Sequence, residues 1–548
     1  MIYKQVELEN VQATIKDGPL AFDTETDGKY GPIRLAQFYQ KDWDKVLVVD
    51  KPNIIQLWSL LSTLSNTLVM QNASYDITTI QRQVGGPFIP KKFDDTLLLA
   101  RLAWPALDKY SLDELFINLY GKDIYAEAGI DKKKMQKASW KINAAITPDQ
   151  YQYAALDVYH LLALYETILP GKDSFSYKLD ILSCYDAFDF QRNGMVVDQD
   201  RVYSMLEANN IRIKELNVPI NVNSYRQVRP YIGSDQSDQL GLATLTLKGN
   251  EKAAVVNEAR KLIKQNSFLN KYLTDDGRVY GVFGPYARSG RYTCSDDNLQ
   301  QLPRKTKGCF GVDDGRIMLY SDFSQLELRS IAAITGDQRL CQTYYDNGDV
   351  HNLVRDMCGT DRQIAKTINF NGLYGGGAGM MRNILIKDAN ILLPVETVNR
   401  DLRKWKNLFR GVAAWQEKGI RDFNGGRLGS TACGRQYRGR MMTDQLNIEN
   451  QGTGAEVAKL AMYYMYDDLK INDCELQNFI HDSYIVDAPQ DEAVIATVSS
   501  RMAEAMKEAW TEVTKQCKVS DIPMPVQVLG GYNWGDIEEG NYVYKYEA

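Results

Sequence analysis

Residues 316–335 read R-I-M-L-Y-S-D-F-S-Q-L-E-L-R-S-I-A-A-I-T, and two structural patterns meet within them. The first six residues are short, apolar and aromatic in character, which favours a buried strand. From Ser324 onward apolar residues recur at roughly helical spacing, and Ser324 with Glu327 forms the S-x-x-E signal of a helix start. Asp322 lies at the junction, where its carboxylate can reach solvent and a cation. Such an aspartate, taken alone, is most often a turn residue or a cap, and the other reading depends on stretches elsewhere in the chain.

Length and composition indicate a globular chain with more than one domain. At 548 residues, the chain exceeds the roughly 250–300 residues at which single hydrophobic cores stop growing. Hydrophobic residues make up 44%, and no apolar run approaches the ~18 residues of a membrane span. We therefore expect two or more domains and no membrane partner.

The numbers of cysteines and histidines and the net charge limit which metal sites and partners the chain is expected to have. The eight cysteines include no C-x-x-C pair, which favours free thiols in a reducing compartment, the cytoplasm, and disfavours a zinc site. Three histidines make histidine-rich metal chemistry improbable. A net charge of −6 speaks weakly against a nucleic-acid partner, but carboxylates gathered to hold cations would also lower the total.

Acidic residues in the first segment stand at informative spacings. Asp23 and Glu25, in L-A-F-D-T-E-T, would project from one face of a strand. A divalent cation between them would relieve their repulsion, although an exposed acidic strand end explains D-x-E equally simply. Asp76 follows an apolar strand and a polar turn, on the first turns of a helix. Tyr153 and Asp157 are four apart on another helix, where a phenol beside a carboxylate suits the orientation of a metal-bound water.

These patterns, D-x-E, N-x-x-x-D and Y-x-x-x-D in this order, resemble the three motifs of the DEDDy 3′–5′ exonucleases. The resemblance implies an RNase H-like domain with a mixed sheet flanked by helices. It also implies that two divalent ions are held by the four acids Asp23, Glu25, Asp76 and Asp157. Tyr153 would position the attacking water. Because every expected acidic position is filled, we expect a working nuclease.

A second group of residues suits degenerate contacts with a nucleic acid. Residues 286–303 combine turn residues with guanidinium and amide side chains, among them Arg291, Asn298, Gln300 and Gln301. Such groups can bond the acceptors that all base pairs share in the minor groove. The stretch closely resembles the T-G-R-L-S-S-x-x-P-N-L-Q-N motif of family A DNA polymerases.

The family resemblance implies further contacts with DNA. Arg260 and Lys264 lie on a predicted helix that is similar to the tip helix of a polymerase thumb, although a charged outer face would look the same. Arg435 lies in the basic patch R-Q-Y-R-G-R, which we expect to contact template phosphates. The family uses a pair matching Asn447 and Gln451 near the primer–template junction.

The most specific signal is a stripe of four residues within residues 361–377. Arg362, Lys366, Phe370 and Tyr374 recur every four residues, so they share one slowly winding helical face. Cations near a helix start can hold a triphosphate, and aromatic side chains further along can stack on a base. The stripe matches motif B of family A, in which phenylalanine at the third place implies discrimination against dideoxynucleotides.

Residues 316–335 and residues 475–488 resemble two further motifs of the same family, motif A and motif C. Asp322 resembles the metal-binding aspartate of motif A, helped by the backbone carbonyl of Phe323. Two apolar runs flank His481-Asp482-Ser483, so the acid would lie at a hairpin tip, as in motif C. The resemblance implies that Asp482 is the second metal-holding acid and that His481 reaches the primer end.

Three positions around these motifs carry open questions. Ser483 stands where motif C usually has glutamate, and we expect polymerisation to survive, with altered metal binding. Glu327 is either the second member of a capping box or, as in the family, a wall under the sugar that excludes a 2′-hydroxyl, and the two readings are compatible. His351 matches the family's D-I-H element and would touch the triphosphate.

We therefore expect an α/β and α+β multidomain protein. Its domains would be a 3′–5′ exonuclease domain over 1–170 and a right-hand polymerase domain over 171–548, with thumb about 200–280, palm about 281–335 and 440–548, and fingers about 336–439. No segment long enough for an added 5′ nuclease domain precedes them. The compact plan suggests a bacteriophage-type enzyme, whose cytoplasm would then be the host's.

The expected reaction is template-directed DNA synthesis with 3′–5′ proofreading. The expected cofactors are two Mg²⁺ ions in the polymerase site and two divalent ions in the exonuclease site, with Mn²⁺ possible in both. The expected partners are primer–template DNA and dNTPs, bound by a monomer. Two alternatives remain open at this point: an exonuclease or DNA-binding protein with an impaired polymerase half, suggested by Ser483, and a single-subunit RNA polymerase, against which Glu327 and the nuclease segment argue.

Overall fold

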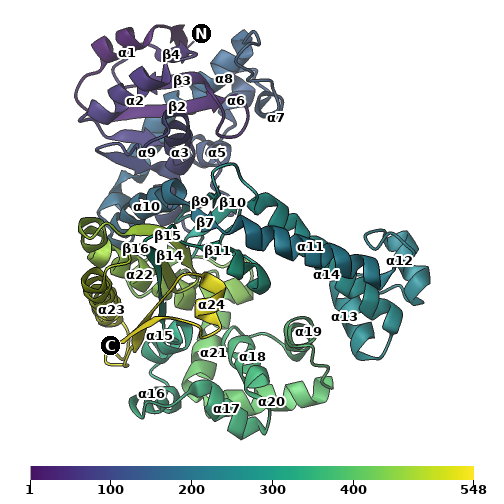
Figure 1. Ribbon diagram of the computed structural model, residues 1–548. Helices are drawn as coiled ribbons and strands as arrows, with labels where there is room; N and C mark the ends of the chain where they lie inside the picture. The colour runs from purple at the N-terminus through teal and green to yellow at the C-terminus, as the bar shows by residue number, and fades with distance from the viewer. Residues whose placement is uncertain (1) are drawn as a thin grey trace. The chain divides into compact units, whose positions relative to one another are not determined.

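The computed structural model describes residues 2–548 (Figure 1). The chain divides into two compact units, and each contains segments that are distant in sequence. Unit 1 comprises Met1–Asn193, Gly281–Asp296 and Cys433–Tyr437. Unit 2 comprises Gly194–Tyr280, Asp297–Ala432 and Arg438–Ala548.

Unit 1 is built on a mixed sheet of six strands, as the sequence predicts. The strand order is β1-β4-β3-β2-β5-β6. The pairs β2/β3 and β3/β4 are antiparallel, and the pairs β1/β4, β2/β5 and β5/β6 are parallel. The strands are β1 (Tyr3–Gln5), β2 (Leu20–Thr26), β3 (Ile33–Tyr39), β4 (Val46–Asp50), β5 (Leu68–Met70) and β6 (Phe93–Asp95).

Helices flank this sheet, and a separate hairpin completes the unit. Helix α8 packs on β2, β3 and β4, and α10 packs on α3 and on strand β9. The helices are α1 (Leu8–Thr14), α2 (Ile54–Thr63), α3 (Ala73–Val84), α4 (Thr96–Ala103), α5 (Leu112–Tyr120), α6 (Ile124–Glu127), α7 (Lys132–Gln136), α8 (Pro148–Tyr159), α9 (Leu161–Ile168) and α10 (Phe175–Asn193). The hairpin is formed by β9 (Gly281–Gly284) and β10 (Thr293–Asp296).

Unit 2 is organised around the strand that contains Asp322. β12 (Arg316–Phe323) is central in the antiparallel sheet β15-β16-β12-β17-β18. It is mostly buried because it pairs with strands on both sides and α23 packs against it. The other strands are β15 (Glu475–Ile480), β16 (Ser483–Pro489), β17 (Val526–Gly531) and β18 (Tyr544–Glu547). The short strands β7 (Met195–Val197), β8 (Arg278–Val279) and β11 (Phe310–Gly311) form a further sheet of this unit. Unit 2 also contains the short strand β13 (Gly429–Ser430), whereas β14 (Gln436–Tyr437) belongs to unit 1.

The helices of unit 2 form recognisable groups. In Figure 1, α11 and α14 run side by side as a long pair, and α12 and α13 pack near one end of it. The two longest helices, α22 and α23, pack against each other. The helices are α11 (Gln199–Leu216), α12 (Tyr225–Ile232), α13 (Gln239–Leu247), α14 (Glu251–Tyr272), α15 (Leu326–Thr335), α16 (Gln338–Tyr345), α17 (Val350–Cys358), α18 (Arg362–Leu373), α19 (Ala378–Ala389), α20 (Val395–Leu408), α21 (Arg410–Asn424), α22 (Met442–Ile471), α23 (Glu492–Thr514) and α24 (Trp534–Glu538), with a 3-10 turn at Arg304–Cys309.

The predicted capping box at the start of α15 is wrong. The residue that precedes the helix is Gln325, not Ser324, and it takes a left-handed conformation with φ 53°. Among the described residues, no side chain caps this helix start. Glu327 instead accepts a hydrogen bond from the hydroxyl of Tyr374. The strand-to-helix junction at Asp322 and the hairpin around Asp482 are confirmed.

No helix within residues 2–548 is both long enough and apolar enough to cross a membrane.

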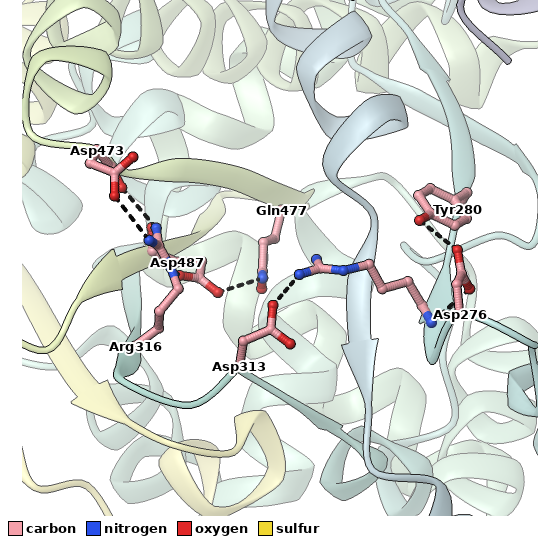
Figure 2. A network of polar contacts seen from close by, with 8 residues as sticks. Asp276, Tyr280, Asp313, Arg316, Asp473, Gln477 and Asp487 are labelled. Carbon is pink, nitrogen blue, oxygen red and sulfur yellow. Dashed lines mark hydrogen bonds and ion pairs between the residues drawn. The ribbon is translucent and has the colours of Figure 1, made fainter. Parts of the chain in front are cut away.

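A polar network ties β12 to the neighbouring strands of its sheet (Figure 2). Arg316 donates to Asp487 on β16 and, at 3.2 Å, to Asp473. Gln477 on β15 donates to the other oxygen of Asp487 at 3.0 Å. Asp487 is buried, and burial raises the pKa of its carboxyl to about 6 despite the neighbouring guanidinium. Removal of Arg316 would therefore leave the buried carboxylate of Asp487 without a compensating charge, which lowers the free energy of unfolding.

We predict that Arg316→Ala destabilises unit 2 by about 3 kcal/mol, since it leaves Asp487 buried without its cation. The measurement is the urea midpoint of the full chain followed by circular dichroism. Arg278→Ala is the matched control because its partner Asp313 is exposed and such pairs contribute about 1 kcal/mol or less. Equal losses in the two variants would contradict the prediction.

Candidate active sites

Four carboxylates meet in unit 1, as their spacing predicts. Asp23 and Glu25 project from β2, and Asp157 comes from α8. One oxygen of each lies within 4.8 Å of one oxygen of both others. Asp76 on α3 is close enough that its charge raises the pKa of both Asp23 and Glu25, and it accepts a hydrogen bond of 2.7 Å from Thr24. The sheet thus gathers acids from three sequence segments.

Burial and mutual repulsion disfavour four negative charges in this place. Burial, then the neighbouring acids, raises the pKa of Asp23 and Glu25 well above the ordinary range. Burial raises the pKa of Asp76 to about 7 and that of Asp157 to about 6. A poorly solvated, all-oxygen donor set of this kind fits hard divalent cations, which would replace protons as the compensating charge.

Two phenols orient Asp157. Tyr153 lies one turn before it on α8, and both Tyr153 and Tyr125 bond to its carboxylate and lower its pKa. The rings of the two tyrosines pack with centroids 5.7 Å apart. The sequence reasoning found Tyr153 from its spacing but missed Tyr125 on the short helix α6, which carries no periodic signal.

Asp95, a second residue that the sequence reasoning missed, holds the start of α3. Its carboxylate accepts from the backbone N–H groups of Asn72 at 3.0 Å and Ala73 at 2.9 Å. Tyr286, from the loop between β9 and β10, donates to the same carboxylate at 2.8 Å. The three bonds fix the helix turn that presents Asp76 to the other acids.

The second acidic site lies in unit 2, where β12 pairs with β16. Asp322 faces Ser483 across the sheet, and the serine donates to its carboxylate at 2.9 Å. Asp482 hydrogen-bonds the same carboxyl group, and the N–H of Phe323 donates to the carbonyl of Asp482 at 3.3 Å. Burial raises the pKa of Asp322 to about 6, and His481 occupies the exposed hairpin turn with φ 58°. Two aspartates 160 positions apart by number (482 − 322) are therefore neighbours.

Helix α18 brings the predicted stripe to this site. Asp361 caps its start, and Arg362 pairs with Asp349 at 2.8 Å. Lys366 is near enough for its charge to lower the pKa of Asp322. Tyr374 at the helix end donates a hydrogen bond to Glu327. The aromatic end of the stripe therefore contacts the residue that is expected to lie under the sugar and exclude a 2′-hydroxyl.

His351 lies on α17 and faces α18. The ring is buried, bonds to Asn369 at 2.9 Å, and packs on Phe370 with centroids 5.9 Å apart. Burial lowers the pKa of the imidazole to about 4, so it is neutral at physiological pH. The side chain lies between α17 and α18 in this arrangement, and the expected contact with a triphosphate stays a prediction.

Two predicted DNA contacts are corrected. Arg435 is buried and its guanidinium pairs with buried Asp180. Arg260 is half-buried and donates to the backbone carbonyls of Val222 and Ser237, each at 2.5 Å. Both guanidinium groups make internal contacts: Arg435 donates to a buried carboxylate and Arg260 to backbone carbonyls, where phosphates of DNA were expected as acceptors.

The other predicted DNA contacts remain at or near the surface. Lys264, Gln301 and His481 are exposed. The half-buried residues are Arg291, Asn298, Gln300, Asn447 and Gln451. Gln300 donates to the carbonyl of Phe479 at 2.9 Å, which ties it to β15.

Comparison with known proteins decides the family. Residues 219–536 match the model of DNA polymerase family A. The chain belongs to that family. Residues 1–171 match a 3′–5′ exonuclease model. The predictions of a family A DNA polymerase with 3′–5′ exonuclease activity and of the two fold classes are confirmed.

The chain is similar in sequence to known DNA polymerases and in fold to a solved polymerase domain. DNA polymerase I of Aquifex aeolicus (strain VF5) is 25% identical over 94% of this chain and 95% of its own. The DNA polymerase of Mycobacterium phage L5 is 25% identical over 69% of this chain and 71% of its own. The polymerase domain of Pol1 from M. smegmatis, solved with DNA primer-template and dNTP, has a similar fold, with TM-score 0.75 and 18% identity over 94% of this chain and 95% of that one.

This family A enzyme combines two activities, template-directed DNA synthesis and 3′–5′ exonuclease cleavage. Both kinds of domain depend on divalent metal ions, and the gathered carboxylates of unit 1 offer suitable ligands. The single-subunit RNA polymerase alternative has no support in these similarities.

We predict that the metal-free protein loses stability as pH rises from about 4 to about 7. The folded-state pKa of Asp76 is about 7 and that of Asp157 about 6, both above the ordinary 3.8 of an unfolded aspartate. In that window the folded state binds more protons than the unfolded state, so unfolding becomes easier as the protons leave. Calorimetry with EDTA should show a melting temperature lower by several degrees at pH 7.5 than at pH 5, and Mg²⁺ should reverse the loss.

The control for this prediction is Asp157→Asn, which removes one of the repelling charges. Its melting temperature should vary less with pH and respond less to Mg²⁺. A variant with the wild-type pH dependence would locate the effect outside the four-carboxylate cluster.

Proposed function

We propose that Asp322 and Asp482, with the backbone carbonyl of Phe323, hold two Mg²⁺ ions in the polymerase site. The observation that supports this is the close approach of the two aspartates at the β12/β16 pair, beside Lys366. When bound, such ions activate a hydroxyl nucleophile and neutralise charge on a leaving pyrophosphate. Lys366 would add positive charge where the triphosphate lies. Mn²⁺ could replace Mg²⁺, because the donors are hard oxygens.

The incoming nucleotide would lie along α18. Arg362 and Lys366 would bind its phosphates, because both are cations on one helical face near the helix start. Phe370 and Tyr374 would stack on the base, while Glu327 fills the place of a ribose 2′-hydroxyl. The bond from Tyr374 to Glu327 supports this, since it holds the carboxylate in one position.

Primer–template DNA would be bound through the surface groups named above. Lys264 would contact phosphates. Amide groups would contact base edges in the minor groove, and His481 at the hairpin turn would lie against the primer end. The predicted domain limits, 1–170 and 171–548 with the thumb, palm and fingers given earlier, are part of this proposal.

In the exonuclease site, Asp23, Glu25, Asp76 and Asp157 would hold two divalent ions. Tyr153 would orient the water that attacks the 3′-terminal phosphodiester, because its hydroxyl already bonds to Asp157. The enzyme would act as a monomer in the cytoplasm, with reduced cysteines.

We predict that Asp322→Ala and Asp23→Ala separate the two activities. Loss of a metal ligand removes several kcal/mol of charge stabilisation, so Asp322→Ala should slow primer extension about a thousandfold and leave 3′ trimming intact. Asp23→Ala should do the reverse. Rates on a 5′-labelled primer–template, resolved on a sequencing gel, measure both. Wild-type enzyme that trims but does not extend would favour the impaired-polymerase alternative, and loss of both activities in either variant would argue against two separate sites.

We also predict that Glu327→Ala admits ribonucleotides. An apolar pocket rejects an added hydroxyl only about a hundredfold, so the filled wall should carry most of the discrimination. The ratio of kcat/KM for dNTP and rNTP should fall about ten- to a hundredfold. Tyr374→Phe is the matched control, because it keeps the ring but removes the bond to Glu327, and we expect a smaller fall. An unchanged ratio in Glu327→Ala would make Glu327 a structural residue only.

A further inference from the structure

The hydroxyl groups of Ser483 and Tyr320 form a chain of two hydrogen bonds that ends at the carboxylate of Asp322. Ser483 Oγ lies 2.9 Å from Asp322 Oδ1, and Tyr320 Oη lies 2.9 Å from the same Oγ. Asp322 and Ser483 are direct cross-strand partners. Tyr320 is two residues before Asp322 on β12, so both side chains leave the same face of the strand. The three groups therefore lie on two paired strands, with no loop between them.

The hydrogen bonds in this line have one direction only. An ionised carboxylate can only accept, so the single proton of Ser483 is given to Asp322. The oxygen of Ser483 can then only accept from Tyr320, whose phenol must be the donor. The order is thus Tyr320 to Ser483 to Asp322, and each bond polarises the next. A carboxylate offers about four acceptor sites, and this line occupies one of them.

Asp482 also hydrogen-bonds the carboxyl group of Asp322, but it is itself a proposed metal ligand and not a neutral support. Glu538 raises the pKa of Asp322, but its carboxylate is held by Lys307 at 2.6 Å and by the indole of Trp534 at 2.9 Å. In the motif that the β15/β16 hairpin resembles, glutamate usually stands in the place of Ser483. An ionised glutamate could not donate to Asp322, whereas a serine can.

We propose that Tyr320 is a positioning residue for polymerisation, which acts through Ser483 to fix the carboxylate of Asp322 in the orientation that receives a divalent cation. The inference rests on the proposed role of Asp322 as a metal ligand. The tyrosine–serine pair supplies order without adding a third negative charge to a site that already holds two. It accounts for how a chain with serine in motif C retains a rigid metal-binding acid.

The test is a double-mutant cycle with Tyr320→Phe, Ser483→Ala and both together. All proteins also carry Asp23→Ala and Asp157→Ala, so that Mn²⁺ binding at the exonuclease site does not contribute. Two quantities are measured: Mn²⁺ affinity by electron paramagnetic resonance without DNA or nucleotide, and the half-saturating Mg²⁺ concentration for primer extension. Residues that orient a metal ligand typically change metal affinity 10–100-fold.

We expect Tyr320→Phe and Ser483→Ala each to weaken Mn²⁺ binding about tenfold and to raise the half-saturating Mg²⁺ concentration in parallel. The double variant should be no weaker than Ser483→Ala, because Tyr320 has no other route to Asp322. Ser483→Thr keeps the donor hydroxyl and should stay within about threefold of the parent. Unchanged Mn²⁺ affinity in Tyr320→Phe, or effects that multiply in the double variant, would overturn the proposal.

Tyr484→Phe is the matched control for stability. This neighbouring tyrosine is fully buried and donates to the carbonyl of Ala458 at 2.6 Å, so its loss also removes one buried hydrogen bond. It should lower the melting temperature as much as Tyr320→Phe but leave Mn²⁺ affinity unchanged. If it weakened Mn²⁺ binding equally, the effect of Tyr320 would be general softening of the sheet and the proposal would fail. A parent enzyme without primer extension would instead defeat the proposed function, independently of this cycle.

Discussion

Antiparallel pairing of β12 with β16 brings two half-buried carboxylates, Asp322 and Asp482, together from distant parts of the chain, and the proposed polymerase site depends on this pairing. Burial raises the pKa of Asp322 because desolvation disfavours its charged form, while hydrogen bonds from Ser483 and Asp482 lower it. The sheet can hold this arrangement because β12 is bonded on both edges and covered by α23. A divalent cation bound here would stabilise the ionised carboxylates that burial disfavours.

The exonuclease site uses the same physics with different supports. Asp76 and Asp157 are buried, Asp23 and Glu25 are half-buried, and all four carboxyl groups have raised pKa values. Neutral donors orient them: Thr24 for Asp76, and Tyr125 with Tyr153 for Asp157. In both sites a neutral hydroxyl orients a carboxylate by a hydrogen bond and leaves the net charge of the acidic cluster unchanged. The chain thus places acidic residues on two sheets and orients them in the same way.

Several basic residues that look like nucleic-acid contacts instead serve the protein interior. Arg435 pairs with Asp180, Arg260 with backbone carbonyls, and His351 with Asn369. A guanidinium can donate to either a phosphate oxygen or an internal oxygen, and composition does not distinguish the two. These three side chains are therefore less available to DNA than the sequence suggests.

The sequence by itself determined the strand-to-helix junction at Asp322, the helix that carries Arg362 and Lys366, and the acids of the exonuclease motifs. These are local properties, because periodicity and spacing place side chains on one face of a single element. Only the tertiary structure decided that Glu327 meets Tyr374 and not a helix cap, that Tyr125 and Asp95 support the exonuclease acids, and that Tyr320 lies behind Ser483. Those contacts join residues far apart in the chain, so they depend on strand register and helix packing, which no local pattern encodes.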